Sequence, residues 1–208
     1  GGYPSLPGML AAILLGVPSC IHEQNAVLGR VNRLLAYRAS GIAASVAGMQ
    51  GMRAIDQAKV TVTGNPVRAE IAACHGRAYH PPETESQFNL LVFGGSQGAK
   101  ILSDAVPVAI AMLPPAALSR LRIVEQCRAV DVDRVREAYE HIGVNAQVKD
   151  FIRDMPEQLS VAHLIISRSG ATTVGEITVA GAPSILVPYP HHGDHQQLAN
   201  ARALASAG

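Results

Sequence analysis

The chain has 208 residues, of which 48% are hydrophobic and 16% charged, a composition that supports a buried core and excludes a disordered chain. Its net charge of +1 and its 4% aromatic content, with no Trp, exclude the basic field and the stacking platforms of nucleic-acid-binding proteins. Its three cysteines form no Cys-x-x-Cys pair, which favours a reducing compartment and argues against a structural zinc.

The first 66 residues show an irregular alternation of helical and strand patterns. The longest apolar run, at 9–15, is too short to cross a bilayer. Periodicity predicts helices at 7–15 and 26–36, and strands at 19–22, 41–45 and 60–63. The last of these strands ends in Gly-Asn-Pro, so we place a domain junction there and divide the chain into domains 1–66 and 67–208.

From residue 89 onward, strands and helices alternate regularly after a polar, proline-rich loop at 81–86. The expected strands are 89–93, 121–124, 146–148, 163–167 and 184–187, and the expected helices are 99–112, 132–141, 173–180 and 195–205. Short connections between alternating elements indicate βαβ units and a parallel sheet covered on both faces. The sequence therefore predicts an α/β fold.

The loop at 94–98 follows a buried strand and opens a helix, a place where open α/β sheets bind ligands. Its glycines allow backbone N–H groups to approach an oxyanion, and Ser96 adds a hydroxyl, so the loop favours a phosphate over a plain turn. It matches neither GxGxxG, because Phe93 stands at the first glycine, nor a Walker A loop, because Lys100 is displaced. A dehydrogenase with Glu125 on the ribose stays an open alternative.

A second loop, at 167–176, also has small residues that open a helix and could hold an anion. Glu176 could accept hydrogen bonds from a ribose diol. The alternative is that Thr173 and Glu176 form a capping box.

A third loop, at 191–197, contains His191 and His195 four residues apart, but Gly193 interrupts the helix that a metal pair would need, so we expect no metal. Gln196 and Gln197 have donors and acceptors that suit sugar hydroxyls, and the alternative is a polar helix start.

Two further polar segments are candidates. His22, Glu23 and Asn25 follow a strand, and the alternative is a polar loop with Asn25 as a helix N-cap. Arg68 at the domain junction could clamp a phosphate, and the alternative is a salt bridge.

Taken in order, the segments GGYPSLPG, HEQN, GNPVR, GGSQGA, RSGATTVGE and HQQ-x-x-NA resemble glycosyltransferase family 28, and within it the bacterial enzymes of peptidoglycan synthesis. The resemblance covers essentially the whole chain. It implies a GT-B fold, in which two Rossmann-like parallel-sheet domains face a cleft, with the N-terminal domain incomplete here.

The resemblance also implies roles for individual residues. Asn25 would contact the donor sugar, and Arg68 and Ser96 the diphosphate. The backbone of Ile152 would meet the uracil, and Glu176 the ribose. The implied donor-binding residues are Asn25, Arg68, Ser96, Ile152, Ala171, Thr172, Thr173, Val174, Gly175, Glu176, Gln196 and Gln197. Those implied on the acceptor side are Tyr3, His22 and Glu23.

The implied activity is inverting transfer of N-acetylglucosamine from UDP-N-acetylglucosamine to lipid I, which gives lipid II, with no metal and no cofactor. The implied location is peripheral, on the cytoplasmic face of the bacterial plasma membrane, with lipid I and the cell-wall and division assembly proteins as partners. The alternatives are another GT-B glycolipid glycosyltransferase, a UDP-N-acetylglucosamine epimerase and a non-catalytic nucleotide-sugar-binding fragment.

The chain departs from the family pattern in what it lacks. The family's GGTGGH loop, whose histidine is the candidate general base, is expected upstream of the first residue, and further helices are expected after the last. Leu6 also replaces a usual glycine. We therefore expect a fragment that is inactive by itself and that contains no visible catalytic base.

Overall fold

The computed structural model describes residues 3–83, 85–95, 99–190 and 195–207, and the chain divides into two compact units. Unit 1 consists of Gly1–Val67, Ser169–Gly175 and Pro188–Gly208, and unit 2 of Arg68–Arg168 and Glu176–Val187. All the strand pairs of the two described sheets are parallel. The predicted α/β class with parallel sheets is confirmed, while the division into domains 1–66 and 67–208 stays a prediction.

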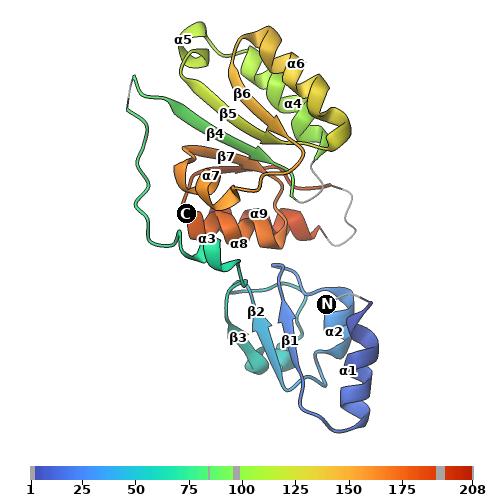
Figure 1. Ribbon diagram of the computed structural model, residues 1–208. Coiled ribbons are helices and arrows are strands. Elements are labelled where there is room, and N and C mark those ends of the chain that lie inside the picture. Colours follow the sequence, from blue (N-terminus) through green and yellow to red (C-terminus); the bar gives the residue numbers. More distant parts are fainter. Residues whose placement is uncertain (1–2, 84, 96–98, 191–194, 208) are drawn as a thin grey trace. The chain divides into compact units, whose positions relative to one another are not determined.

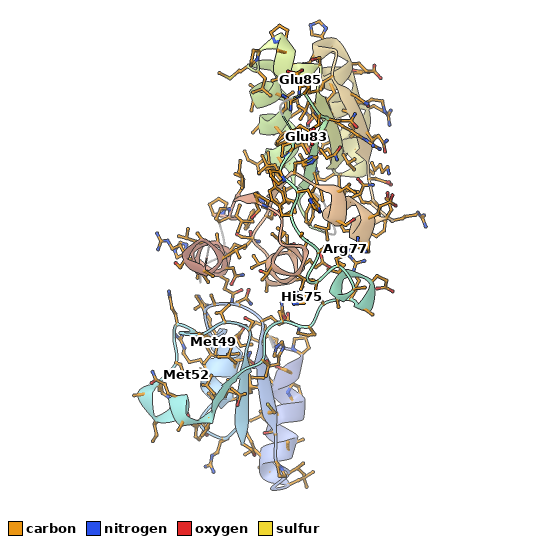
Figure 2. All side chains as sticks on the ribbon, turned by 90° about the vertical axis from the view of Figure 1, so that its left-hand side faces the viewer. Met49, Met52, His75, Arg77, Glu83 and Glu85 are labelled. Carbon is orange, nitrogen blue, oxygen red and sulfur yellow. The ribbon has the colours of Figure 1, made fainter. Side chains whose placement is uncertain are left out.

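Unit 1 contains a three-stranded sheet in the order β1-β2-β3. Its elements before residue 67 are α1 (Ser5–Leu14), β1 (Cys20–Glu23), α2 (Arg30–Leu35), β2 (Gly41–Ala44), the 3-10 helix η1 (Ala54–Lys59) and β3 (Val60–Val62). Ile21, Leu35 and Ile42 form the centre of its core, and Met49 and Met52, labelled in Figure 2, pack against it. The helix α9 (Gln196–Ala207) also belongs to this unit.

Unit 2 contains a five-stranded sheet in the order β6-β5-β4-β7-β8. Its strands are β4 (Phe88–Phe93), β5 (Leu121–Gln126), β6 (Asn145–Lys149), β7 (Leu164–Ser167) and β8 (Ser184–Leu186). Its helices are α3 (Ala69–Ala72), α4 (Lys100–Ala111), α5 (Pro115–Leu118), the 3-10 helix η2 (Ala129–Asp131), α6 (Val132–Ile142) and α7 (Met155–Val161), and α8 (Ala171–Ala180) continues into it from unit 1. Along the segment between α3 and β4 lie His75, Arg77, Glu83 and Glu85 (Figure 2).

The strand order of unit 2 creates a switch point between β4 and β7. The chain steps outward from β4 through β5 to β6 and then returns to place β7 on the other side of β4. Right-handed crossovers therefore put α4 and α6 on one face of the sheet and α7 on the opposite face (Figure 1). In open α/β sheets the strand ends at such a reversal leave a crevice in which ligands bind.

The core of unit 2 lies between the sheet and the pair α4 and α6. Val135 and Tyr139, one helical turn apart on α6, are almost completely buried against the strands. Gly143 ends α6 in the left-handed conformation, with φ of 76°, so the helix stops where the sequence predicts.

The predicted helix at 26–36 is wrong at its start, since α2 begins only at Arg30. The backbone around Ala26 is used elsewhere: its N–H donates to the Asn200 side chain, and its carbonyl accepts from Gln50 N. Val27 then forms a parallel bridge with Gln50. Extended pairing therefore competes successfully with helix formation over these residues. None of the helices in the described part of the chain is long and apolar enough to cross a membrane.

Candidate functional site

The first predicted loop begins where β4 ends, at Phe93, on one side of the switch point. Gly95 has φ of 87°, a conformation that side chains rarely adopt, so a glycine is required there. Ser96, predicted to face a phosphate, lies outside the described residues. The loop leads into α4 at Lys100.

Glu176 and Arg68 lie together in unit 2. An Arg68 guanidinium nitrogen is 3.2 Å from Glu176 Oε1, and the Glu176 side chain is 9% exposed while that of Arg68 is 54% exposed. The structure thus contains the salt bridge weighed as an alternative for Arg68. The guanidinium nevertheless remains accessible to an anion beside a carboxylate that can accept from hydroxyls.

The capping-box alternative for Glu176 is wrong. The helix α8 begins at Ala171, and the Gly170 carbonyl accepts from Val174 N at 2.9 Å. Thr173 is therefore inside the first turn rather than at the N-cap, so Glu176 does not close a capping box with it.

Ile152 lies between β6 and α7 in unit 2, and its side chain is 2% exposed. Its neighbours Phe151 and Arg153 are exposed. A buried side chain at this position anchors the loop and leaves the backbone to make any outward contact.

The HEQN segment in unit 1 is organised by Glu23, which is 4% exposed. One carboxylate oxygen accepts from Asn25 N and Nδ2 at 3.1 and 3.2 Å, and the other accepts from Gly29 N at 2.9 Å and Asn32 Nδ2 at 2.8 Å. The N-cap of α2 is Gly29, so the N-cap alternative for Asn25 is wrong. The neighbouring His22 places Nε2 3.2 Å from the Gly64 carbonyl.

Asn200 on α9 joins three segments of unit 1. Its side-chain oxygen accepts from Ala26 N at 2.7 Å, and its amide donates to Asn25 Oδ1 and to the Ser169 carbonyl, both at 3.1 Å. Gln197, on the same helix, accepts from Ser169 Oγ through its backbone carbonyl and from Tyr189 N through its side-chain oxygen. These contacts bring predicted site residues Asn25 and Gln197 into one hydrogen-bonded network.

Asn65 holds the start of α8 within unit 1. Its amide donates to the Ala171 carbonyl at 2.9 Å. A Cβ at Gly175 would lie 3.4 Å from Asn65 Cβ and 3.5 Å from Val67 Cγ1, so a glycine allows this close approach. Gly175, predicted to line a nucleotide, thus has a packing role in unit 1.

Glu125 cannot contact a ribose, because its side chain is fully buried in the core of unit 2. The dehydrogenase alternative that depended on it is therefore wrong. Among the described residues, His, Cys, Asp and Glu side chains form no group of three or more that could hold a metal ion.

Comparison with known protein families identifies the family of this chain. Residues 89–208 match the model of the glycosyltransferase family 28 C-terminal domain, and residues 1–44 match that of the family 28 N-terminal domain. The chain belongs to glycosyltransferase family 28. The predicted family is thereby confirmed.

Relatives within family 28 align with the entire chain. The chain is 51% identical over 208 residues to the UDP-N-acetylglucosamine–N-acetylmuramyl-(pentapeptide) pyrophosphoryl-undecaprenol N-acetylglucosamine transferase of Rhodospirillum centenum, and 50% identical to the enzyme with the same name from Brucella abortus. It covers 55% and 54% of their lengths, so it spans about half of these curated relatives.

A crystal structure of MurG from Acinetobacter baumannii has a TM-score of 0.80 and 36% identity to this chain, with 100% of this chain and 57% of that one covered. The predicted GT-B fold class is confirmed by this likeness.

The structure distributes the residues implied by the family 28 resemblance over both units. Unit 1 contains those of the HEQN segment, the first half of α8 and the start of α9, and unit 2 contains Arg68, Ile152 and Glu176. Tyr3, 81% exposed, makes its side chain available to a ligand. Sequence reasoning missed Asn65 and Asn200, although both stand inside the quoted motifs, because an isolated Asn gives no sign of its partner.

Proposed function

We propose that the complete protein transfers N-acetylglucosamine from UDP-N-acetylglucosamine to lipid I with inversion at the anomeric carbon, giving lipid II. The observation that carries this proposal is the 51% identity over the whole chain to a relative named for that transfer. One fold can host many unrelated reactions, so the proposal depends on this sequence identity and not on the shared fold alone.

The geometry supports a donor site for the UDP-sugar. Glu176 supplies a carboxylate to the ribose diol, and Arg68 beside it supplies a positive charge to the diphosphate. The charge that develops on the leaving UDP then meets a guanidinium and helix N-terminal amides, which stabilise it without a metal. The backbone of Ile152 contacts the uracil, and residues 171–176 at the start of α8 line the nucleotide.

The sugar is assigned to unit 1. Asn25, held by Glu23 and Asn200, contacts the donor sugar together with Gln196 and Gln197. Tyr3, His22 and the Glu23 segment face the acceptor. In this assignment Glu23 acts by shaping the loop, because both of its oxygens are already engaged.

We also infer that the protein is peripheral on the cytoplasmic face of the plasma membrane. Leu14 and Leu15 are 85% and 78% exposed, and Leu10 on α1 is 45% exposed, so this helix presents apolar surface to solvent. Apolar side chains on one helix face can enter a lipid interface. Sedimentation with anionic lipid vesicles tests this, and a Leu14→Ser/Leu15→Ser variant that binds as well as the parent would contradict it.

The activity is tested by following radiolabelled N-acetylglucosamine from its UDP donor to a lipid I analogue, using the complete protein. We expect Glu176→Ala to raise the donor KM about tenfold or more, because a charged hydrogen-bond partner of the ribose is lost. Glu137→Ala, an exposed carboxylate on α6, is the matched control and should not change the KM.

A complete protein that folds but transfers no label would refute the proposed reaction. Unchanged KM and kcat in Glu176→Ala would instead refute the assignment of Glu176 to the ribose.

A further inference from the structure

Gln126 stands at the end of β5, between the two strands that lead into the proposed phosphate and uracil loops. The strand β5 lies between β4 and β6 (Figure 1). Gln126 pairs in register with Phe93, the last residue of β4, and with Lys149, the last residue of β6. Its side chain is a carboxamide that is 4% exposed, at the carboxyl edge of the sheet. A buried amide in this place must satisfy its hydrogen bonds locally.

The Gln126 amide is directed at the next loop. Nε2 donates to the Asp150 carbonyl at 3.2 Å, two residues before Ile152. The backbone reinforces this contact, since Cys127 N donates to the Lys149 carbonyl at 3.0 Å. Gln126 therefore fixes the orientation of the peptide with which the loop begins.

The far end of the same loop is held separately. Asp154 accepts from Gln158 Nε2 at 2.7 Å, and Lys149 Nζ lies 3.7 Å from its other oxygen. Between the two ends, the buried side chain of Ile152 anchors the middle. The loop is thus held at Asp150, Ile152 and Asp154, so its backbone N–H and C=O groups are presented in one arrangement.

We propose that Gln126 is a positioning residue for base recognition: through its bond to Asp150 it holds the loop backbone in the arrangement that distinguishes uracil from cytosine. This inference rests on the proposed function, in which the Ile152 backbone meets the uracil. Uracil presents an N–H donor at N3 and a carbonyl at C4, whereas cytosine presents an acceptor and an amino donor. A fixed backbone N–H and C=O pair can therefore tell the two bases apart, and a displaced pair cannot.

The test measures the dissociation constants of UDP and CDP on the same samples of the complete protein by calorimetry. Gln126→Leu removes the donor, and Gln126→Glu keeps the shape but turns an acceptor toward the Asp150 carbonyl. We expect the wild type to prefer UDP, and we expect both variants to reduce the ratio of CDP to UDP dissociation constants about fivefold to tenfold. Gln147→Glu, an exposed position on the neighbouring strand β6, carries the same charge change and should keep the wild-type ratio.

The ratio is informative even for a destabilised variant, because a smaller folded fraction affects both nucleotides alike. If the variants keep the wild-type ratio of the two dissociation constants, whether or not both nucleotides bind more weakly, the role of Gln126 is overturned and the proposed function stays intact. A wild type that binds UDP no better than CDP would overturn the uridine site itself, and this inference with it.

Discussion

Glu125, near the end of β5, and Cys127, just after it, show how burial changes the chemistry of a single residue. Glu125 is fully buried, and Tyr139 donates a hydrogen bond of 2.6 Å to its Oε2, while its Oε1 has no hydrogen-bond partner among the described residues. Burial raises the pKa of Glu125, although the Tyr139 bond opposes the shift. Burial, with the nearby Glu125 and Asp131, also raises the pKa of Cys127 to about 11, so this thiol stays protonated at neutral pH.

Glu125→Gln should stabilise the protein at neutral pH. The raised pKa means that the folded state favours the neutral acid, so the stability from Glu125 is present below pH 4.5 and is lost as the pH rises through the folded-state pKa. Gln copies the neutral acid and can still accept from Tyr139. We expect the Tm at pH 7 to rise by about 2–4 °C, and the gain to disappear near pH 4.

Thermal denaturation at both pH values checks this prediction, with Glu137→Gln on the exposed face of α6 as the control. A gain of equal size at pH 4 and pH 7 would show that ionisation of Glu125 is not its cause.

At the scale of elements, α4 and α6 are joined by charges as well as by apolar packing. Asp131 accepts from Arg128 Nε at 2.6 Å and from Arg134 at 3.0 Å, and Arg134 also reaches Asp104 on α4 at 3.0 Å. The hydrogen bonds from Arg128 and Arg134 lower the pKa of Asp131 to about 2. This network fixes the start of α6 and ties it to α4 across the sheet face.

Asp131→Asn should therefore destabilise the protein in a pH-dependent way. Because the pKa is depressed from 3.8 to about 2 on folding, the contribution is present above pH 3.8 and is lost as the pH falls toward 2. We expect the Tm to fall by about 2 °C at pH 6, and the difference from the wild type to narrow below pH 4. Melting curves from pH 3 to pH 7 test this, and Asp133→Asn, an exposed neighbour on α6, is the control.

At the scale of the whole molecule, residues from opposite ends of the sequence build one unit. Ala26 and Asn200 are 174 positions apart and are joined by a buried hydrogen bond of 2.7 Å. Asn200 then connects the HEQN segment to the loop before α8 through Ser169. The long-range contacts of one side chain thus hold three segments of unit 1 together.

Asn200→Asp tests this connection without changing the side-chain size. The carboxylate still accepts from Ala26 N but cannot donate to Asn25 or to the Ser169 carbonyl, and it buries a charge. We expect the Tm to fall by about 4 °C or more. Asn145→Asp, exposed at the start of β6, is the matched control, and equal melting of the two variants would contradict a structural role for Asn200.

The sequence predicted the regular half of the chain well, because β4, β7 and β8 contain short apolar runs that alternate with helical patterns. It missed α7, although Pro156 at the helix start is a typical signal, because the helix is only seven residues long and shows little periodicity. It also extended α2 backward over Ala26, because local periodicity does not include the competing bridge from Gln50.

The candidate site also depends on contacts that local sequence patterns do not record. The motifs and their order can be read directly from the sequence, and by themselves they determined the α/β class and the family, whereas the loops expected to meet a nucleotide-sugar stay a prediction. Only the tertiary structure decided what each polar side chain does: Glu23 organises its own loop, Arg68 meets Glu176, Glu125 belongs to the core, and Asn200 holds Asn25. The physical reason is that burial and hydrogen-bond partners depend on residues far apart in the chain, which no local pattern records.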